Sequence, residues 1–247
     1  MRRLALLLAL GLAGCLGGGG AQPVVTIPDP MAYLTGPERR YDFGHYQVTQ
    51  SVAVAPDRAV TTWEYPAAPA GNGGEQYVIE DDTVRIEGTR DGGTPYDQHF
   101  VGRDCGGTGW IVFRTDAGPA WRETIAHLGI SADPAQCNAG SPALTRYTLR
   151  PVDFPAIGRR EAIVSEHYST GSIDAPAMER SFFVRGMGRV TWQAFSAAPP
   201  SLPPDEMARR LPDFGWQTAG ALNLVDGRIS VFADGPVTKP PSWQLGK

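Results

Sequence analysis

The stretch RSFFVRGMGRVTWQAF, residues 180–195, decides the fold class of this chain. It contains two runs, 180–185 and 189–195, that are rich in aromatic residues and valine, which are enriched in β-strands. The Gly-Met-Gly at 186–188 predicts a tight connection between them, because glycine adopts the positive φ angles of short turns without steric cost. The stretch therefore predicts two antiparallel strands joined as a hairpin.

Strand-like segments extend outward from this hairpin in both directions. From Tyr46 to Val54, apolar and polar residues alternate with the period of two that is typical of a half-buried strand. Asp-Asp at 81–82 separates two segments, and Asp-Gly at 226–227 predicts a two-residue hairpin turn. Further strands are expected at residues 59–65, 75–80, 83–89, 97–101, 109–115, 144–150, 161–168, 221–225 and 228–232.

Two helices are predicted. Residues 120–128 place Trp121, Ile125 and Leu128 on one helical face, at positions i, i+4 and i+7. A second, short helix is expected at residues 201–211, where serine and prolines suit a first helical turn. About ten short strands with so few helices predict a mainly β fold, either an antiparallel β-sandwich or a partly open β-barrel with one or two short helices.

The first residues of the chain form a targeting segment. Two arginines precede an apolar run, residues 4–12, that is far shorter than the ~20 residues of a membrane-spanning helix and has the length of a signal-peptide core. The run leads into Leu-Ala-Gly-Cys at 12–15, which resembles the lipobox of bacterial lipoproteins. The resemblance implies that Cys15 receives a diacylglyceryl group, that a peptidase removes residues 1–14, and that a further acyl chain such as palmitate often joins the new amino terminus.

The lipoprotein resemblance also implies a location and a domain organisation. Residues 15–30 would form the lipidated cysteine and a flexible, glycine-containing tether to the membrane, and residues 31–247 a single β-rich periplasmic domain. Leu16 stands where an aspartate signals inner-membrane retention in enterobacteria, so it favours the outer membrane of the bacterial cell envelope. The alternative is an ordinary secreted or cytosolic protein with an incidental cysteine.

The charge of the mature chain excludes one class of partner. Loss of residues 1–14 would leave 20 of the 22 basic residues and all 26 acidic residues, for a formal charge of −6. A nucleic-acid-binding protein needs a basic surface, and so does a protein that adheres to anionic lipid. We therefore expect no nucleic-acid partner, and membrane contact through the lipid anchor.

The cysteines predict a disulfide. The chain has three, and lipidation of Cys15 would leave Cys105 and Cys137 as a pair in an oxidising compartment, where disulfides persist. Such a cross-link would stabilise the fold by about 3–4 kcal/mol in the chain-entropy model. The alternative is two buried, unpaired thiols. Neither cysteine has a second cysteine or a histidine at metal-ligand spacing, so we expect no metal site, and no motif indicates a cofactor.

No catalytic residue is assigned from the sequence. The four histidines form no zinc-protease motif, the glycine-rich residues 104–110 lack the ending of a phosphate-binding loop, and no nucleophile elbow is present. Glu166 and His167 suit acid–base chemistry, but adjacent strand residues point to opposite faces of a sheet and would not share a site. The acidic residues 80–82 are expected to be solvated rather than to bind calcium.

Aromatic residues suggest an alternative function in carbohydrate binding, because exposed rings can stack on sugars. Trp63 and Tyr65 would share one face of a strand, and Trp216 and Trp243 lie in loop-like sequence. These four are the candidate ligand-stacking residues. The other tryptophans are expected in the core, since large aromatic side chains usually fill it.

Residues 179–195 resemble the hairpin near the end of several uncharacterised cell-envelope lipoproteins of bacteria. The resemblance implies a cell-envelope β domain and brings no catalytic residues with it. The shared pattern is an aromatic strand, Gly-x-Gly, a valine and a closing aromatic residue, formed here by Phe182, Phe183, Gly186, Gly188, Val190 and Trp192.

The sequence thus predicts a non-enzymatic envelope lipoprotein that holds a ligand or a partner protein. The alternatives are a carbohydrate-binding module and a polysaccharide hydrolase, which would need two carboxylates about 5–10 Å apart. A deep apolar cavity would favour lipid or small-molecule carriage, and a flat strip of tryptophans would favour a sugar. Two facing acids with raised pKa would favour hydrolysis, and a closed surface would favour a structural or interaction role.

Overall fold

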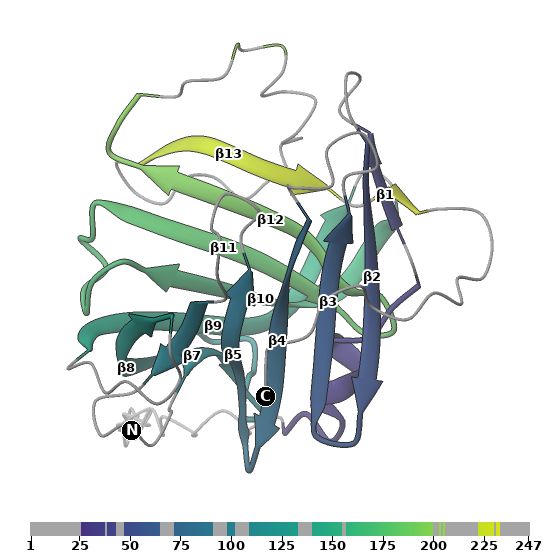
Figure 1. The fold of residues 1–247 in the computed structure, drawn as a ribbon, viewed down its shortest axis with the longest axis horizontal. Helices are drawn as coiled ribbons and strands as arrows, with labels where there is room; N and C mark the ends of the chain where they lie inside the picture. Colours follow the sequence, from purple (N-terminus) through teal and green to yellow (C-terminus); the bar gives the residue numbers. More distant parts are fainter. Residues whose placement is uncertain are drawn as a thin grey trace, which may run out of the picture.

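The computed structural model of this chain is mainly β and antiparallel, and its strands form one curled sheet shaped like a half-barrel (Figure 1). This confirms the expected fold class. The structure describes residues 26–37, 39–42, 47–64, 72–90, 98–101, 109–132, 140–154, 157–199, 203, 205, 222–229 and 231–232.

Each predicted strand overlaps an observed one, and the predicted turn at 81–82 joins β4 to β5. The sheet order is β13-β12-β11-β10-β9-β8-β6-β5-β4-β3-β2-β1-β14, with β7 paired to β5 beside this path. In chain order the elements are the 3₁₀ helix η1 (Pro30–Tyr33) and the strands β1 (Arg39–Asp42), β2 (Gln47–Ala55), β3 (Arg58–Glu64), β4 (Gly73–Glu80), β5 (Thr83–Arg90), β6 (Gln98–Val101), β7 (Trp110–Arg114), β8 (Arg122–Ser131), β9 (Ser141–Phe154), β10 (Gly158–Tyr168), β11 (Ala177–Val184), β12 (Gly188–Ser196), β13 (Asn223–Ile229) and β14 (Val231–Phe232).

The sheet curls because two of its strands change neighbours along their length. β8 pairs with β9 through residues 122–128 and with β6 through residues 129–131. β5 pairs with β7 through residues 83–86 and with β6 through residues 88–89. These changes place the half β8–β13 against the half β1–β5, and the strands of the two halves cross steeply in Figure 1. We call the face of β8–β13 that meets β4, β5 and β7 the inner face, and the opposite one the outer face.

The predicted hairpin at residues 180–195 is confirmed as β11 and β12. The Met187 N–H donates to the Val184 carbonyl at 2.9 Å and closes the turn. Gly186 and Gly188 have φ angles of 70° and 65°, the conformation for which glycine was expected here.

The predicted helix at residues 120–128 is wrong, because this segment belongs to strand β8 and pairs with β9. Trp121 packs on the outer face, and Ile125, which is 55% exposed, shares that face by alternation. Leu128 packs on the central core from the inner face. The residues at helical spacing therefore lie on opposite faces of the sheet. Pairing with β9 determines the conformation of this segment in spite of its helix-like spacing of apolar residues.

The predicted two-residue turn at Asp226 and Gly227 is also wrong. β13 runs straight through both residues, with Asp226 opposite Ala194 and Gly227 opposite Gln193 of β12. Neither residue has a positive φ angle. Pairing with β12 keeps this segment extended in spite of its local turn signal.

The predicted helix at residues 201–211 lies outside the described residues, apart from two of its positions.

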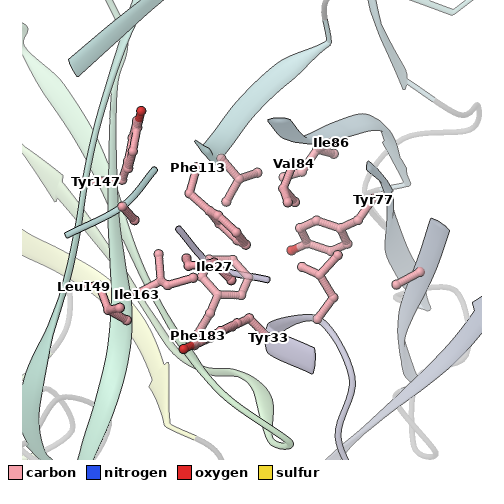
Figure 2. Close-up of a cluster of buried hydrophobic side chains, with 14 of the residues drawn as sticks. Ile27, Tyr33, Tyr77, Val84, Ile86, Phe113, Tyr147, Leu149, Ile163 and Phe183 are labelled. Carbon is pink, nitrogen blue, oxygen red and sulfur yellow. The ribbon is translucent and has the colours of Figure 1, made fainter. Parts of the chain in front are cut away.

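The main core lies between the two halves of the sheet. Figure 2 shows Phe113 of β7 and Ile27 between Tyr77 of β4 on one side and Ile163 of β10 on the other. The Phe183 ring lies 5.8 Å from that of Phe113 and 6.2 Å from that of Tyr77, between ring centroids. Aromatic contacts of this kind add to the free energy gained by burial, so Phe183 helps to join the halves.

The segment before β1 belongs to this core. Ile27 and Tyr33 are buried in it, and the Ile27 N–H donates to the Thr115 carbonyl at 2.6 Å. The packed domain therefore begins by residue 27, inside the segment for which a tether was expected.

Candidate functional site

An open groove lies beside the main core, on the inner face of β8–β13. Its volume is about 510 Å³, and its lining is mostly apolar. Sites for small molecules usually have about 300–1,000 Å³ and mostly apolar walls, so this groove has the size and character of a binding site. Its apolar wall includes Phe100, Trp110, Leu128, Ile130, Ala143 and Val225.

Strand β7 fixes one end of the groove. Thr145 Oγ1 of β9 donates to the Ile111 carbonyl at 2.8 Å, and Ser165 Oγ of β10 donates to the Val112 carbonyl at 2.5 Å. These bonds hold β7 against the inner face of both strands. They set the position of Trp110, the first residue of β7, at the edge of the groove.

His167 of β10 lies in the lining, against Trp110. The centroid of its imidazole is 3.8 Å from the indole ring of Trp110, with 38° between the planes, and Phe100 meets the same indole edge-on at 5.5 Å. Its Nδ1 is 3.3 Å from Thr145 Oγ1. Burial lowers the pKa of His167 to about 3, so the ring is neutral at physiological pH.

Glu179 lies directly opposite His167 in the pairing of β10 with β11. Its Oε2 accepts a hydrogen bond from Trp192 Nε1 at 2.9 Å. Both His167 and Glu179 line the groove, and both also line a small cavity next to it. They therefore form the polar end of a mostly apolar site.

The small cavity has a volume of about 20 Å³, enough for a single water molecule. On its far side Arg189 of β12 and Glu75 of β4 form an ion pair at 2.9 Å, and Tyr77 also donates to the Glu75 carboxylate. The Arg189 guanidinium lies 5.7 Å from the centroid of the Trp63 ring. The positive charge of Arg189 is thus paired, and Arg189 lines the small cavity and not the groove.

The outer face of the same strands carries a different arrangement. Polar residues stand directly opposite one another across five strands, from β8 to β12. They separate two apolar clusters on this face, one around Phe182 and one around Met178. We call this row the outer ladder, and its members in strand order are Glu123, Arg146, Glu166, Arg180 and Gln193.

The centre of the outer ladder is a buried ion pair. Arg180 donates from Nε and Nη2 to Glu166 Oε1 at 2.9 and 2.7 Å, and both side chains are 5% exposed or less. Tyr168 donates to Glu166 Oε2 at 2.8 Å. Burial, followed by the charge of Glu166, raises the pKa of Tyr168 to about 12, so it remains a donor. Both oxygens of Glu166 are thus hydrogen-bonded, and the buried pair has a structural role.

The sequence prediction for Glu166 and His167 is confirmed, since the two side chains lie on opposite faces of β10 and share no site.

Near the acidic turn at 81–82, Asp82 binds Arg114. Hydrogen bonds from Arg114, and then Thr83, hold the pKa of the Asp82 carboxyl below its usual range. Among the residues that the structure describes, no group of three histidine, cysteine or acidic side chains is placed to hold a metal ion.

The candidate stacking and modification residues are mostly outside the described ranges. Trp63 is described, and it is half-buried in β3 with Arg189 over its ring. The other positions lie outside the described residues, and what the sequence predicts for them stays a prediction. These positions are Cys15, Tyr65, Cys105, Cys137, Trp216 and Trp243.

Neither the contact of Trp110 with His167 nor the position of Glu179 was predicted from the sequence. The available signal was alternation, which places His167 on the same face as the core residue Ile163. No local pattern indicates that β7 crosses that face, because β7 reaches it through the non-local pairing with β5.

Within the described part of the chain, no helix is long and apolar enough to cross a membrane. Comparison with known protein families, with characterised proteins and with solved structures found no match to this chain.

Proposed function

We propose that this chain is a lipid-anchored binding protein of the bacterial cell envelope that carries a small apolar or amphipathic molecule in the groove of β6–β13. The observation that carries the proposal is the groove itself, with about 510 Å³ and mostly apolar walls. An apolar ligand would lose contact with water there, and each buried methylene contributes about 0.8 kcal/mol.

The exposure of the groove wall supports a bound ligand. Ile130 is 54% exposed although it lines the groove, and Leu128 and Trp110 are only partly buried. Contiguous apolar surface of this kind in a monomer usually marks an interaction site. A ligand in the groove would cover these side chains.

The amino-terminal sequence supports the location. The lipobox-like residues 12–15 precede Ile27, the first packed residue among those that the structure describes, so lipid on Cys15 would leave this packed part intact. In this proposal, acyl chains on Cys15 hold the protein at the outer membrane, facing the periplasm. Cys105 and Cys137 form a disulfide there.

The two alternative functions have less support. The described tryptophans, Trp63, Trp110, Trp121 and Trp192, are all at least partly buried, whereas a sugar platform needs exposed rings. The carboxylates beside the small cavity are held in hydrogen bonds, as shown by Glu179 with Trp192. Neither a flat aromatic strip nor a pair of free facing acids is present among the described residues.

The binding proposal is tested with a lipid-free form of the mature chain. A Cys15→Ser variant, exported and purified without detergent, is titrated with the apolar dye Nile red, whose fluorescence rises in apolar surroundings. We expect saturable binding. An Ala194→Trp variant fills the groove from β12, and we expect its affinity for the dye to fall at least about tenfold, through lost apolar contact.

An Ile125→Trp variant is the matched control, because it adds the same ring on the exposed outer face of β8. We expect its affinity to equal that of the parent chain. Equal affinity of all three proteins would contradict the groove as the binding site. The anchor is tested separately, by mass spectrometry of the amino terminus of the unmodified protein, in which we expect a lipidated Cys15.

A further inference from the structure

The hydrogen-bonding state of His167 follows from its neighbour Thr145. A threonine hydroxyl has one hydrogen to donate, and that of Thr145 is given to the Ile111 carbonyl at 2.8 Å. Thr145 Oγ1 can therefore only accept a hydrogen bond from His167, whose Nδ1 lies 3.3 Å away. The Nδ1 atom of His167 carries the hydrogen.

The other ring nitrogen is consequently an acceptor. A neutral imidazole has one N–H, and burial keeps the pKa of His167 far below physiological pH. With the hydrogen on Nδ1, Nε2 presents a lone pair. Within the described residues Nε2 has no hydrogen-bond partner, and the side chain is partly exposed and lines the groove.

A carboxylate lies beside this acceptor, on the side of the groove. Glu179 stands opposite His167 and also lines the groove, and its carboxylate accepts hydrogen bonds. The described lining of the groove includes no lysine or arginine. Its serines, 141, 169 and 196, lie at strand ends, at the rim. The polar end of the groove thus offers acceptors and negative charge.

We infer that the groove is specific for an apolar molecule whose polar end donates a hydrogen bond to His167 Nε2, an alcohol or an amine, and that it rejects a carboxylate. A hydroxyl or amine at this position would satisfy Nε2. A carboxylate has no hydrogen to donate at neutral pH and would meet the negative charge of Glu179. This inference rests on the proposed function and names the ligand class of the same groove.

The test compares ligands that differ only in the head group. Decanol, decylamine, decanoate and methyl decanoate compete with Nile red for the Cys15→Ser chain. We expect decanol or decylamine to bind at least about tenfold more tightly than decanoate and the methyl ester, since only the first two can donate. Either order of the alcohol and the amine supports the inference.

The failures of the two proposals are distinguishable. If neither Nile red nor any decyl compound binds, the proposed function fails. If the compounds bind with equal affinity, or decanoate binds most tightly, the function stands and the inference about the head group is overturned.

A variant and a spectroscopic measurement localise the effect. His167→Phe keeps a ring against Trp110 but has no acceptor, so we expect the preference for decanol over methyl decanoate to disappear while dye binding persists. A preserved preference would overturn the role of His167. Nitrogen NMR of the unsubstituted ring needs no variant that could misfold. We expect a protonated Nδ1 and a bare Nε2, and the opposite tautomer would overturn the inference.

Discussion

Glu166 and His167 are neighbours in β10, yet the two faces of the sheet use them in opposite ways. On the outer face Glu166 is buried and receives hydrogen bonds from Arg180 and Tyr168. On the inner face His167 is neutral, and only one of its ring nitrogens has a partner among the described residues. Both oxygens of the structural carboxylate are therefore bonded, whereas the groove keeps one hydrogen-bonding atom of His167 open.

Breaking the outer pair should have the largest effect on stability. An Arg180→Met variant leaves Glu166 as a buried charge without its main partner. We expect the free energy of unfolding to fall by about 3–5 kcal/mol, which is the usual cost of removing one member of a buried ion pair. Urea unfolding followed by tryptophan fluorescence measures this loss.

Two controls show whether burial is the cause. Arg159, which is 69% exposed, also forms an ion pair, with Asp153 at 3.7 Å, and we expect Arg159→Met to cost about 1 kcal/mol or less. Replacing both partners, in Glu166→Leu/Arg180→Met, should recover most of the stability, because no uncompensated charge remains. A cost for Arg180→Met no larger than for Arg159→Met would contradict the structural role of the outer ladder.

The inner face should lose stability as the pH falls, because of His167. His167 has a pKa of about 3 in the folded chain and an ordinary value of 6.5 in the unfolded chain. Below pH 6.5 the unfolded state binds a proton that the folded state does not, so stability is present at neutral pH and is lost as pH falls toward 3. Between pH 7 and pH 5 we expect a loss of about 2 kcal/mol from this group.

The measurement compares the change in unfolding free energy between the two pH values in two proteins. The free energy of unfolding is obtained at both pH values for the parent chain and for His167→Phe, so that the titration of other groups, including Glu179, cancels. The parent chain should lose about 2 kcal/mol more than the variant. The same pH dependence in both proteins would mean that His167 is not held neutral by the groove.

The fold was predictable from the sequence wherever alternation and turn residues agreed. The hairpin of β11 and β12 combines aromatic strands with glycines at Gly186 and Gly188 that have positive φ angles. The two errors, at residues 120–128 and at Asp226 and Gly227, arose where a local signal competed with strand pairing. In both places the partner strand, β9 or β12, decides the conformation.

The candidate site was predictable only in part. Alternation places Glu166 and His167 on opposite faces, since side chains of a strand point alternately to either side. The sequence does not indicate that Trp110 lies against His167, because their contact depends on the curl of the sheet and on the pairing of β7 with β5. The apolar groove is likewise assembled from strands that are far apart in the sequence.

The smallest expected effect is the cost of His167→Phe at neutral pH. The substitution removes one hydrogen bond, to Thr145, and keeps a ring against Trp110, so we expect the free energy of unfolding to fall by about 1 kcal/mol or less. Urea unfolding at pH 7 measures it. A loss as large as that of Arg180→Met would assign His167 to the framework of the fold. A small loss together with altered head-group preference would show that adjacent residues of β10 divide stability and binding between them.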